Sequence, residues 1–148
     1  MIRSILSNKK QYLDLLLLGD EQESMIDKYL DRGELFGIFS CDGEIKAICV
    51  VTDEGNNIIE LKNIAVVPQY QRQGLGKMLI DFLIKQYSSK FLIMRVGTGD
   101  SPITISFYRQ CGFKEVFRVK NFFIDNYDEP IFEAGQQLID MVYLELIF

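Results

Sequence analysis

The sequence predicts a mixed α/β protein with a single domain over residues 1–148. Segments with the apolar spacing of strands and of helices alternate in the order β, αα, βββ, α, β, α, ββ. A chain of 148 residues can bury a substantial core as one domain. Its 48% hydrophobic and 25% charged residues are typical of a globular protein.

The N-terminal part is expected to form one strand and two helices. Residues 1–6 can form a short strand, and residues 8–18 have helical apolar spacing. Asp14 interrupts that apolar cluster and no small-residue cleavage site follows, so we interpret it as an amphipathic helix rather than a signal peptide. The second predicted helix covers residues 21–32, ends at Gly33 and carries its apolar face on Met25, Ile26, Tyr29 and Leu30.

Three adjacent antiparallel strands are predicted next. Residues 35–40 and 44–52 are strand-like, and the turn Cys41-Asp42-Gly43 between them is a hairpin signal. A second turn, DEGNN at 53–57, leads into a strand over 58–67. Because these connections are short, neighbouring strands must run in opposite directions.

The C-terminal half is predicted to alternate between helices and strands. Residues 75–87 have helical apolar spacing, and residues 90–97 form a continuous apolar strand expected to be buried on both faces. A helix over 101–111 would have Ser101 as its N-cap and Pro102 in its first turn. The last two strands cover residues 115–124 and 138–148.

Composition excludes several classes of function. A net charge of −5 argues against sequence-independent nucleic-acid binding, which needs a basic surface, but it suits a cationic partner. The absence of histidine excludes Ser-His-Asp and Cys-His catalysis and any zinc site built on imidazole. Three cysteines without a CxxC pair favour a reducing compartment, and no apolar segment is long enough to cross a membrane. We therefore expect a cytoplasmic enzyme without a metal.

The strongest functional signal is NIAVVPQYQRQGLGKML at residues 63–79. Gly74 and Gly76 stand where a helix follows an apolar strand. Free N–H groups at a helix N-terminus attract anions, and glycines would let a pyrophosphate approach them, with Arg72 and Lys77 adding positive charge. The Walker A and dinucleotide motifs are both incomplete here, and close helix–sheet packing would explain the glycines equally well.

Two segments resemble the GNAT superfamily of N-acetyltransferases. QRQGLG at 71–76, preceded by NIAVVP, resembles its acetyl-CoA signature, Q/R-x-x-G-x-G/A, and is similar to the same stretch of ribosomal-protein N-terminal acetylases. SPITISFYRQCGF at 101–113 resembles a downstream GNAT helix with a tyrosine, three residues and then Gly-Phe, here Tyr108, Gly112 and Phe113. The order of the predicted elements also matches the family, so the resemblance spans nearly the whole chain. The chain resembles uncharacterised bacterial members of the family.

The resemblance implies a GNAT-like acyl-CoA N-acyltransferase fold, with a central mixed, mostly antiparallel sheet of about seven strands flanked by about four helices. In this family the strand before the glycine turn splays from the next strand at a bulge, and the cofactor enters the opening. The strand edge binding pantetheine and the thioester carbonyl would be Ile64, Ala65 and Val66. The residues whose amides are expected to hold the pyrophosphate are Arg72, Gln73, Gly74, Leu75, Gly76 and Lys77, and Gln71 is also expected to bind the cofactor.

Two positions depart from the family pattern. Ser101 stands where GNAT enzymes often have an asparagine near the pantetheine, so its contact with the cofactor is expected to be weaker or absent. The ribosomal-protein acetylases place a catalytic glutamate on the strand after the glycine motif. This chain has Met94 to Val96 there, with Arg95 as the nearest match.

Acetyl transfer requires an acceptor amine without its proton and a proton for the departing thiolate. Glu60 lies where several GNAT enzymes have a general-base glutamate; a water relay or a merely solvated carboxylate are the alternatives. Tyr108 is expected to be the general acid, and a core tyrosine beside Phe107 is the alternative. We expect Cys111 to be a small buried residue rather than an acyl-carrying thiol.

We therefore predict an N-acetyltransferase that moves the acetyl group of acetyl-CoA to an amine of a small molecule or peptide by direct attack. Either a monomer or a homodimer is compatible with the sequence. Four acidic residues of the late connection would favour a cationic amine if they border the acceptor cleft: Asp125, Asp128, Glu129 and Glu133. A solvated acidic loop is the alternative for that segment, and a non-catalytic acyl-CoA-binding sensor or interaction module is the alternative for the whole chain.

Overall fold

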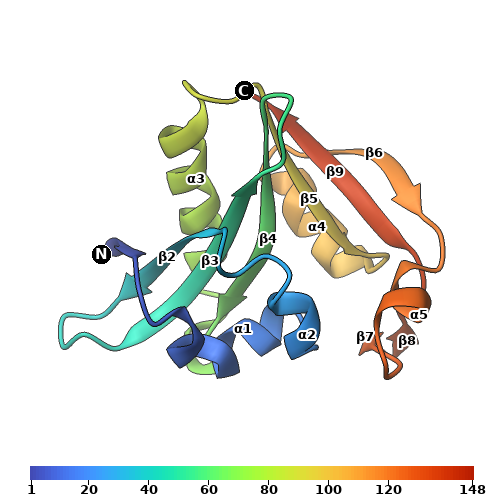
Figure 1. Ribbon diagram of the computed structural model, residues 1–148, viewed down its shortest axis with the longest axis horizontal. Coiled ribbons are helices and arrows are strands. Elements are labelled where there is room, and N and C mark those ends of the chain that lie inside the picture. Colours follow the sequence, from blue (N-terminus) through green and yellow to red (C-terminus); the bar gives the residue numbers. More distant parts are fainter.

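The computed structural model describes residues 1–148 and contains a seven-stranded sheet with helices on both faces (Figure 1). Its strands are β1 (Ile2–Ile5), β2 (Glu34–Phe39), β3 (Ile45–Asp53), β4 (Ile58–Val66), β5 (Ile93–Gly99), β6 (Lys114–Val119) and β9 (Met141–Ile147). The helices are α1 (Leu13–Gly19), α2 (Glu23–Ile26), α3 (Leu75–Tyr87), α4 (Pro102–Gln110) and α5 (Phe122–Asn126). Two 3₁₀ helices, η1 (Lys9–Tyr12) and η2 (Pro68–Tyr70), and a small hairpin, β7 (Phe132–Glu133) with β8 (Gln136–Gln137), complete the fold.

The strand order in the sheet is β1-β2-β3-β4-β5-β9-β6. Every neighbouring pair is antiparallel except β4 and β5, which are connected through α3 and run parallel. The predicted mixed, mostly antiparallel sheet of about seven strands is thereby confirmed. The final strand β9 lies between β5 and β6 and pairs with both of them.

β4 and β5 pair over only part of their length. Ile58–Leu61 pair with Ile93–Val96, and no pairing follows beyond those residues. At the same point β4 has a bulge, because Leu61 pairs with Val51 and Asn63 with Val50, which leaves Lys62 as an extra residue. The two strands then diverge into an open V (Figure 1). The splay and the bulge expected from the family resemblance are thus confirmed.

The sheet has a separate apolar core on each face. Buried side chains of α3 and α4 pack on one face, and those of α1 and α2 pack on the other. The bulge also changes which β4 residues face each core. Before it, Ile59 and Leu61 point toward α3, whereas after it Ile64 does so and Ala65 points toward α1.

Three predicted elements differ in extent from the structure, and one element was not predicted. The helix predicted over 21–32 is a regular helix only at Glu23–Ile26 and continues as turns, although Ile26, Tyr29 and Leu30 are buried as expected. The strand predicted over 115–124 ends at Val119, because Asn121 adopts a left-handed conformation (φ 58°) and starts α5. The hairpin of β7 and β8 was not predicted, and the last strand begins at Met141 rather than at residue 138. None of the helices is both long and apolar enough to span a bilayer.

Candidate active site

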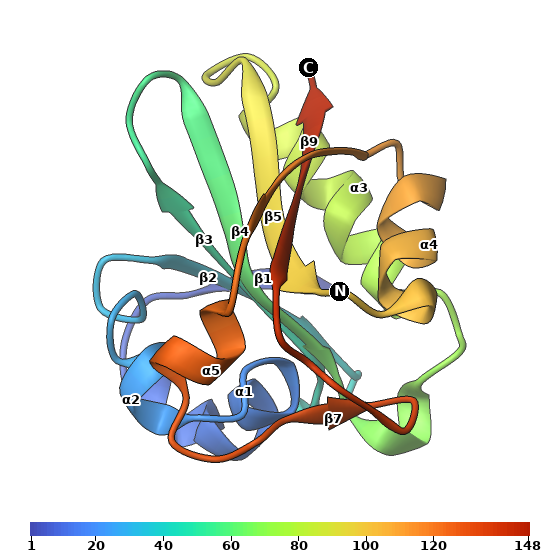
Figure 2. The ribbon, with the colours of Figure 1, turned by 90° about the vertical axis from the view of Figure 1, so that its right-hand side faces the viewer.

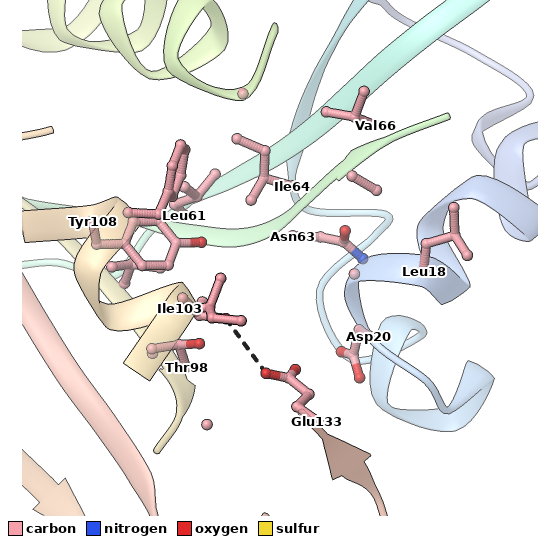
Figure 3. Close-up of a pocket in the computed structure, with 18 of the residues that line it drawn as sticks. Leu18, Asp20, Leu61, Asn63, Ile64, Val66, Thr98, Ile103, Tyr108 and Glu133 are labelled. Atoms are coloured by element: carbon pink, nitrogen blue, oxygen red, sulfur yellow. Dashed lines mark hydrogen bonds between the residues drawn. The ribbon is translucent and has the colours of Figure 1, made fainter. Parts of the chain in front are cut away.

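A cleft of about 700 Å³ lies where β4 and β5 have separated (Figure 3). Its walls come from Leu61–Val66 of β4, Val96–Gly99 of β5, the glycine turn before α3, and α4. The loop after α1 and parts of the segment between residues 123 and 141 close its remaining side. A cleft of this size is in the range of small-molecule sites.

One end of the cleft is formed by the glycine turn and the first turn of α3. Gly74 is the N-cap of α3 in a left-handed conformation (φ 81°), and a β-carbon there would have no atom within 4 Å. A β-carbon on Gly76 would instead lie 3.2 Å from the Phe107 ring. Gly74 therefore leaves space for a ligand at the helix N-terminus, whereas Gly76 permits α3 and α4 to pack closely.

The edge of β4 forms the middle of the cleft. Ile64, Ala65 and Val66 all line it, and on their β5 side they have no partner strand. The sheet therefore leaves main-chain hydrogen-bonding groups available there. Gln71 secures the end of this edge, because its Nε2 donates a hydrogen bond to the Val66 carbonyl at 3.0 Å.

Tyr108 lies in the last turn of α4 and belongs to the cleft wall. Its side chain is only 5% exposed, and its ring makes edge contacts with Phe107 and Phe113 at centroid distances of 5.2 and 5.7 Å. Figure 3 shows its hydroxyl pointing into the cavity. Burial raises the pKa of this phenol above its ordinary value, so it stays protonated at neutral pH.

Comparison with known proteins identifies the family. Residues 32–115 match the family model of the acetyltransferase (GNAT) domain. The chain belongs to the GNAT acetyltransferase family. It is 38% identical over 135 residues to YvbK of Bacillus subtilis, described as an uncharacterised N-acetyltransferase, with 90% of this chain and 86% of that one covered.

A solved GNAT family acetyltransferase from Elizabethkingia anophelis, with acetyl-CoA bound, has the same architecture. Its TM-score is 0.93 at 35% identity, covering 100% of this chain and 97% of that one. The similarity to ribosomal-protein acetylases is confirmed over half of the chain. The Escherichia coli ribosomal protein bS18 alanine N-acetyltransferase is 36% identical over 77 residues, which are 50% of this chain and 49% of that one. This chain is therefore an N-acetyltransferase.

Most of the residues predicted to bind the cofactor line the cleft of this acetyltransferase. They are Ile64, Ala65, Val66, Gln71, Arg72, Gly74, Leu75, Gly76 and Lys77. Gln73 and Ser101 do not line it. Ser101 is buried at the N-cap of α4, as expected, but its hydroxyl makes no capping hydrogen bond.

Glu60 lies outside the lining of the cleft and is 6% exposed. Its carboxylate is paired with the ammonium group of Lys62 at 2.7 Å, and Lys62 does line the cleft. The base role of Glu60 stays a prediction. On β5, Arg95 pairs with Glu145 at 2.7 Å, so an ion pair occupies the strand where the ribosomal-protein acetylases place their glutamate.

Sequence reasoning missed Asp20 and Glu21, two of the three acidic residues that line the cleft. Of the four acidic residues of the late connection, Glu133 lines the cleft, but so do Asp20 and Glu21, which follow α1. Burial raises the pKa of Glu21, and the charges of Glu133 and Asp20 raise it further. The only sequence signal was Gly19-Asp20 at the end of an apolar helix, which says nothing about distant partners.

The acidic end is held together by hydrogen bonds between distant segments. Tyr29 and Tyr127 donate to the two carboxylate oxygens of Asp20 at 2.9 and 2.6 Å. The Gln22 side chain accepts a hydrogen bond from the backbone N–H of Asp128 at 2.8 Å. Figure 2 shows the late connection, which includes Tyr127 and Asp128, running from α5 past α2 and α1 to β7. The late connection, which carries the acidic residues considered for the acceptor cleft, therefore closes one side of the cleft.

Proposed function

We propose that this enzyme transfers the acetyl group of acetyl-CoA to an amine of a small molecule or peptide. The observation that carries the proposal is the splay of β4 from β5, which opens a cleft between the glycine turn and Tyr108. The relative from Elizabethkingia anophelis, which has acetyl-CoA bound, supports the same donor here.

The donor would lie along β4 with its phosphates at the start of α3. The N-terminus of α3 supplies free N–H groups and a partial positive charge, and the open space at Gly74 lets an anion reach them. Arg72 and Lys77 add two cationic side chains to the same end of the cleft. The unpaired edge of Ile64–Val66 would then hydrogen-bond the amide groups of the pantetheine arm.

Tyr108 would supply the proton for the leaving thiolate. Its phenol faces the cavity and stays protonated at neutral pH. A group that can donate a proton to sulfur as negative charge develops contributes about 10²-fold or more to the rate.

The acceptor would carry positive charge. Asp20, Glu21 and Glu133 line the cleft, so the local field around them favours a cationic amine. The preference for a cationic amine would then come from Asp20 and Glu21 after α1 and from Glu133 in β7, rather than from all the acidic residues of the late connection.

The test is release of CoA thiol from acetyl-CoA by the purified chain in the presence of an amine panel. The panel contains alkylamines, linear diamines, amino acids and short peptides, and mass spectrometry identifies the acetylated product. We expect cationic members to be acetylated. Thermal stabilisation by acetyl-CoA without acetylation of any member would contradict the proposed reaction.

A further inference from the structure

Asp20 is brought to the cleft by the close approach of α1 to β4. Gly19, the last residue of α1, has no side chain to hold the two elements apart. A β-carbon there would lie 2.9 Å from the Ile64 carbonyl oxygen and 2.1 Å from Asn63 Oδ1. The end of α1 therefore touches β4 at the residues that would lie beside the thioester, and Asp20 follows immediately.

The Asp20 carboxylate is fixed in place by phenols from two other segments. Tyr29 donates to Oδ2 at 2.9 Å, and Tyr127 donates to Oδ1 at 2.6 Å. The Tyr29 hydroxyl itself accepts a hydrogen bond from Asn63 Nδ2 at 3.1 Å. A carboxylate has about four lone-pair positions, and the backbone N–H of Gln22 also bonds the Asp20 carboxylate, so one position stays free for a ligand. Asp20 is thus oriented through Tyr29 by β4 itself.

We propose that Asp20 is the group that removes a proton from the acceptor ammonium, an assignment that rests on the proposed function. One N–H proton moves from the ammonium to the Asp20 carboxylate, and the freed nitrogen lone pair forms the C–N bond with the thioester carbonyl carbon. The C–S bond then breaks, and the CoA thiolate takes its proton from Tyr108. The second proton lost by the nitrogen restores Tyr108, and Asp20 releases its proton to solvent.

Asp20 suits this role better than the other carboxylates. Glu60 is paired with Lys62 outside the lining of the cleft, and Glu133 has one long contact of 3.4 Å from Thr104 Oγ1. Glu21 is exposed and is not held by a side-chain hydrogen bond.

The surroundings of Asp20 also adjust its basicity. Burial raises the pKa of Asp20. Hydrogen bonds from Tyr127, Tyr29 and the backbone N–H of Gln22, and the charge of Lys62, oppose the rise. The other charged groups at this end of the cleft are Glu21 and Glu133. A carboxylate with a raised pKa accepts a proton more readily at neutral pH.

The experiment measures kcat and KM against pH for the best acceptor of the amine panel, using the full chain. Asp20→Asn should lower kcat about 10²-fold, in addition to a rise of a few-fold in KM for a cationic acceptor, and Asp20→Glu should recover part of the loss in kcat. The decline of kcat/KM toward acid pH should disappear in Asp20→Asn. Asp14→Asn, an exposed carboxylate on α1, is the matched control and should behave as wild type.

Tyr127→Phe provides a second variant that keeps the carboxylate. It removes a hydrogen bond that lowers the pKa of Asp20, so the acid decline of kcat/KM should move to higher pH. A rise in KM alone in Asp20→Asn, or loss of the acid decline in Glu60→Gln instead, would overturn the assignment. If the wild type is active and Asp20→Asn equals it, only this inference fails; if the wild type acetylates no amine, the proposed function fails as well.

Discussion

Gly19 and Asn63 lie so close together that a β-carbon on Gly19 would fall 2.1 Å from Asn63 Oδ1. Any side chain at position 19 must therefore displace the Asn63 side chain or push α1 away from β4. We expect Gly19→Ala to destabilise the fold by about 1–3 kcal/mol, the usual cost of overpacking, and to lower kcat by displacing Asp20. Thermal unfolding and steady-state kinetics measure the two effects. Asp14→Ala on the exposed side of α1 should change neither, and an unchanged Gly19→Ala variant would show that this contact can relax freely.

Gly74 and Gly55 offer a matched test of acetyl-CoA binding. Both have φ near 80°, and a β-carbon on either would meet no atom within 4 Å. Alanine should therefore cost both sites about 1–2 kcal/mol of conformational strain. Only Gly74→Ala should weaken CoA binding, because only Gly74 lies at the cleft. Calorimetric titration with CoA distinguishes the two variants, and equal affinities would argue against phosphate binding at this turn.

Tyr108→Phe tests the general acid. The variant keeps the aromatic packing against Phe107 and Phe113, so stability and acetyl-CoA affinity should barely change. We expect kcat to fall about 10²-fold or more. Tyr87→Phe is the control, since Tyr87 is equally buried but lies away from the cleft. Wild-type turnover in Tyr108→Phe would assign that tyrosine to the core alone.

Comparing variants of Glu133 and Glu129 tests whether the acceptor responds to charge at the cleft or to the overall charge of the late connection. Glu133 lines the cleft and Glu129 is exposed outside it. Glu133→Gln should raise KM for a cationic acceptor about 5-fold, or ~1 kcal/mol, and leave KM for acetyl-CoA unchanged. Glu129→Gln should change neither constant. Equal effects of the two variants in initial-rate measurements would contradict an acceptor site at this end.

The acidic end of the cleft should also make stability depend on pH. The pKa values of Asp20 and Glu21 are raised in the folded state, so the folded chain holds more protons than the unfolded chain just above their ordinary pKa values. Stability should therefore decrease as pH rises through that window. Glu21→Gln should reduce this decrease and raise the melting temperature at pH 7. Melting curves between pH 4 and 7, with Glu44→Gln in the exposed β2–β3 turn as control, measure the effect.

The sequence by itself determined the elements of the fold and the donor end of the site. The turns at Gly43 and Gly55, both with positive φ, and the apolar spacing of α3 are local properties, so they could be predicted from neighbouring residues. The glycine turn was recognisable for the same reason, because Gly74 and the residues that surround it are contiguous in the chain. The end of β6 was predicted too late in the chain, because the apolar pattern continues past Val119. The left-handed conformation of Asn121 stops the strand there.

Only the tertiary structure decided which carboxylates meet at the acceptor end. Asp20, Tyr29 and Tyr127 are joined by hydrogen bonds between three segments that no local pattern relates. The β4 bulge at Lys62 changes which side chains face each core, and Glu60 pairs with Lys62 instead of lining the cleft. A pattern with a period of two cannot show an inserted residue, and long-range contacts depend on packing between elements. For these physical reasons the donor site could be predicted from the sequence, whereas the acceptor site emerged from the fold.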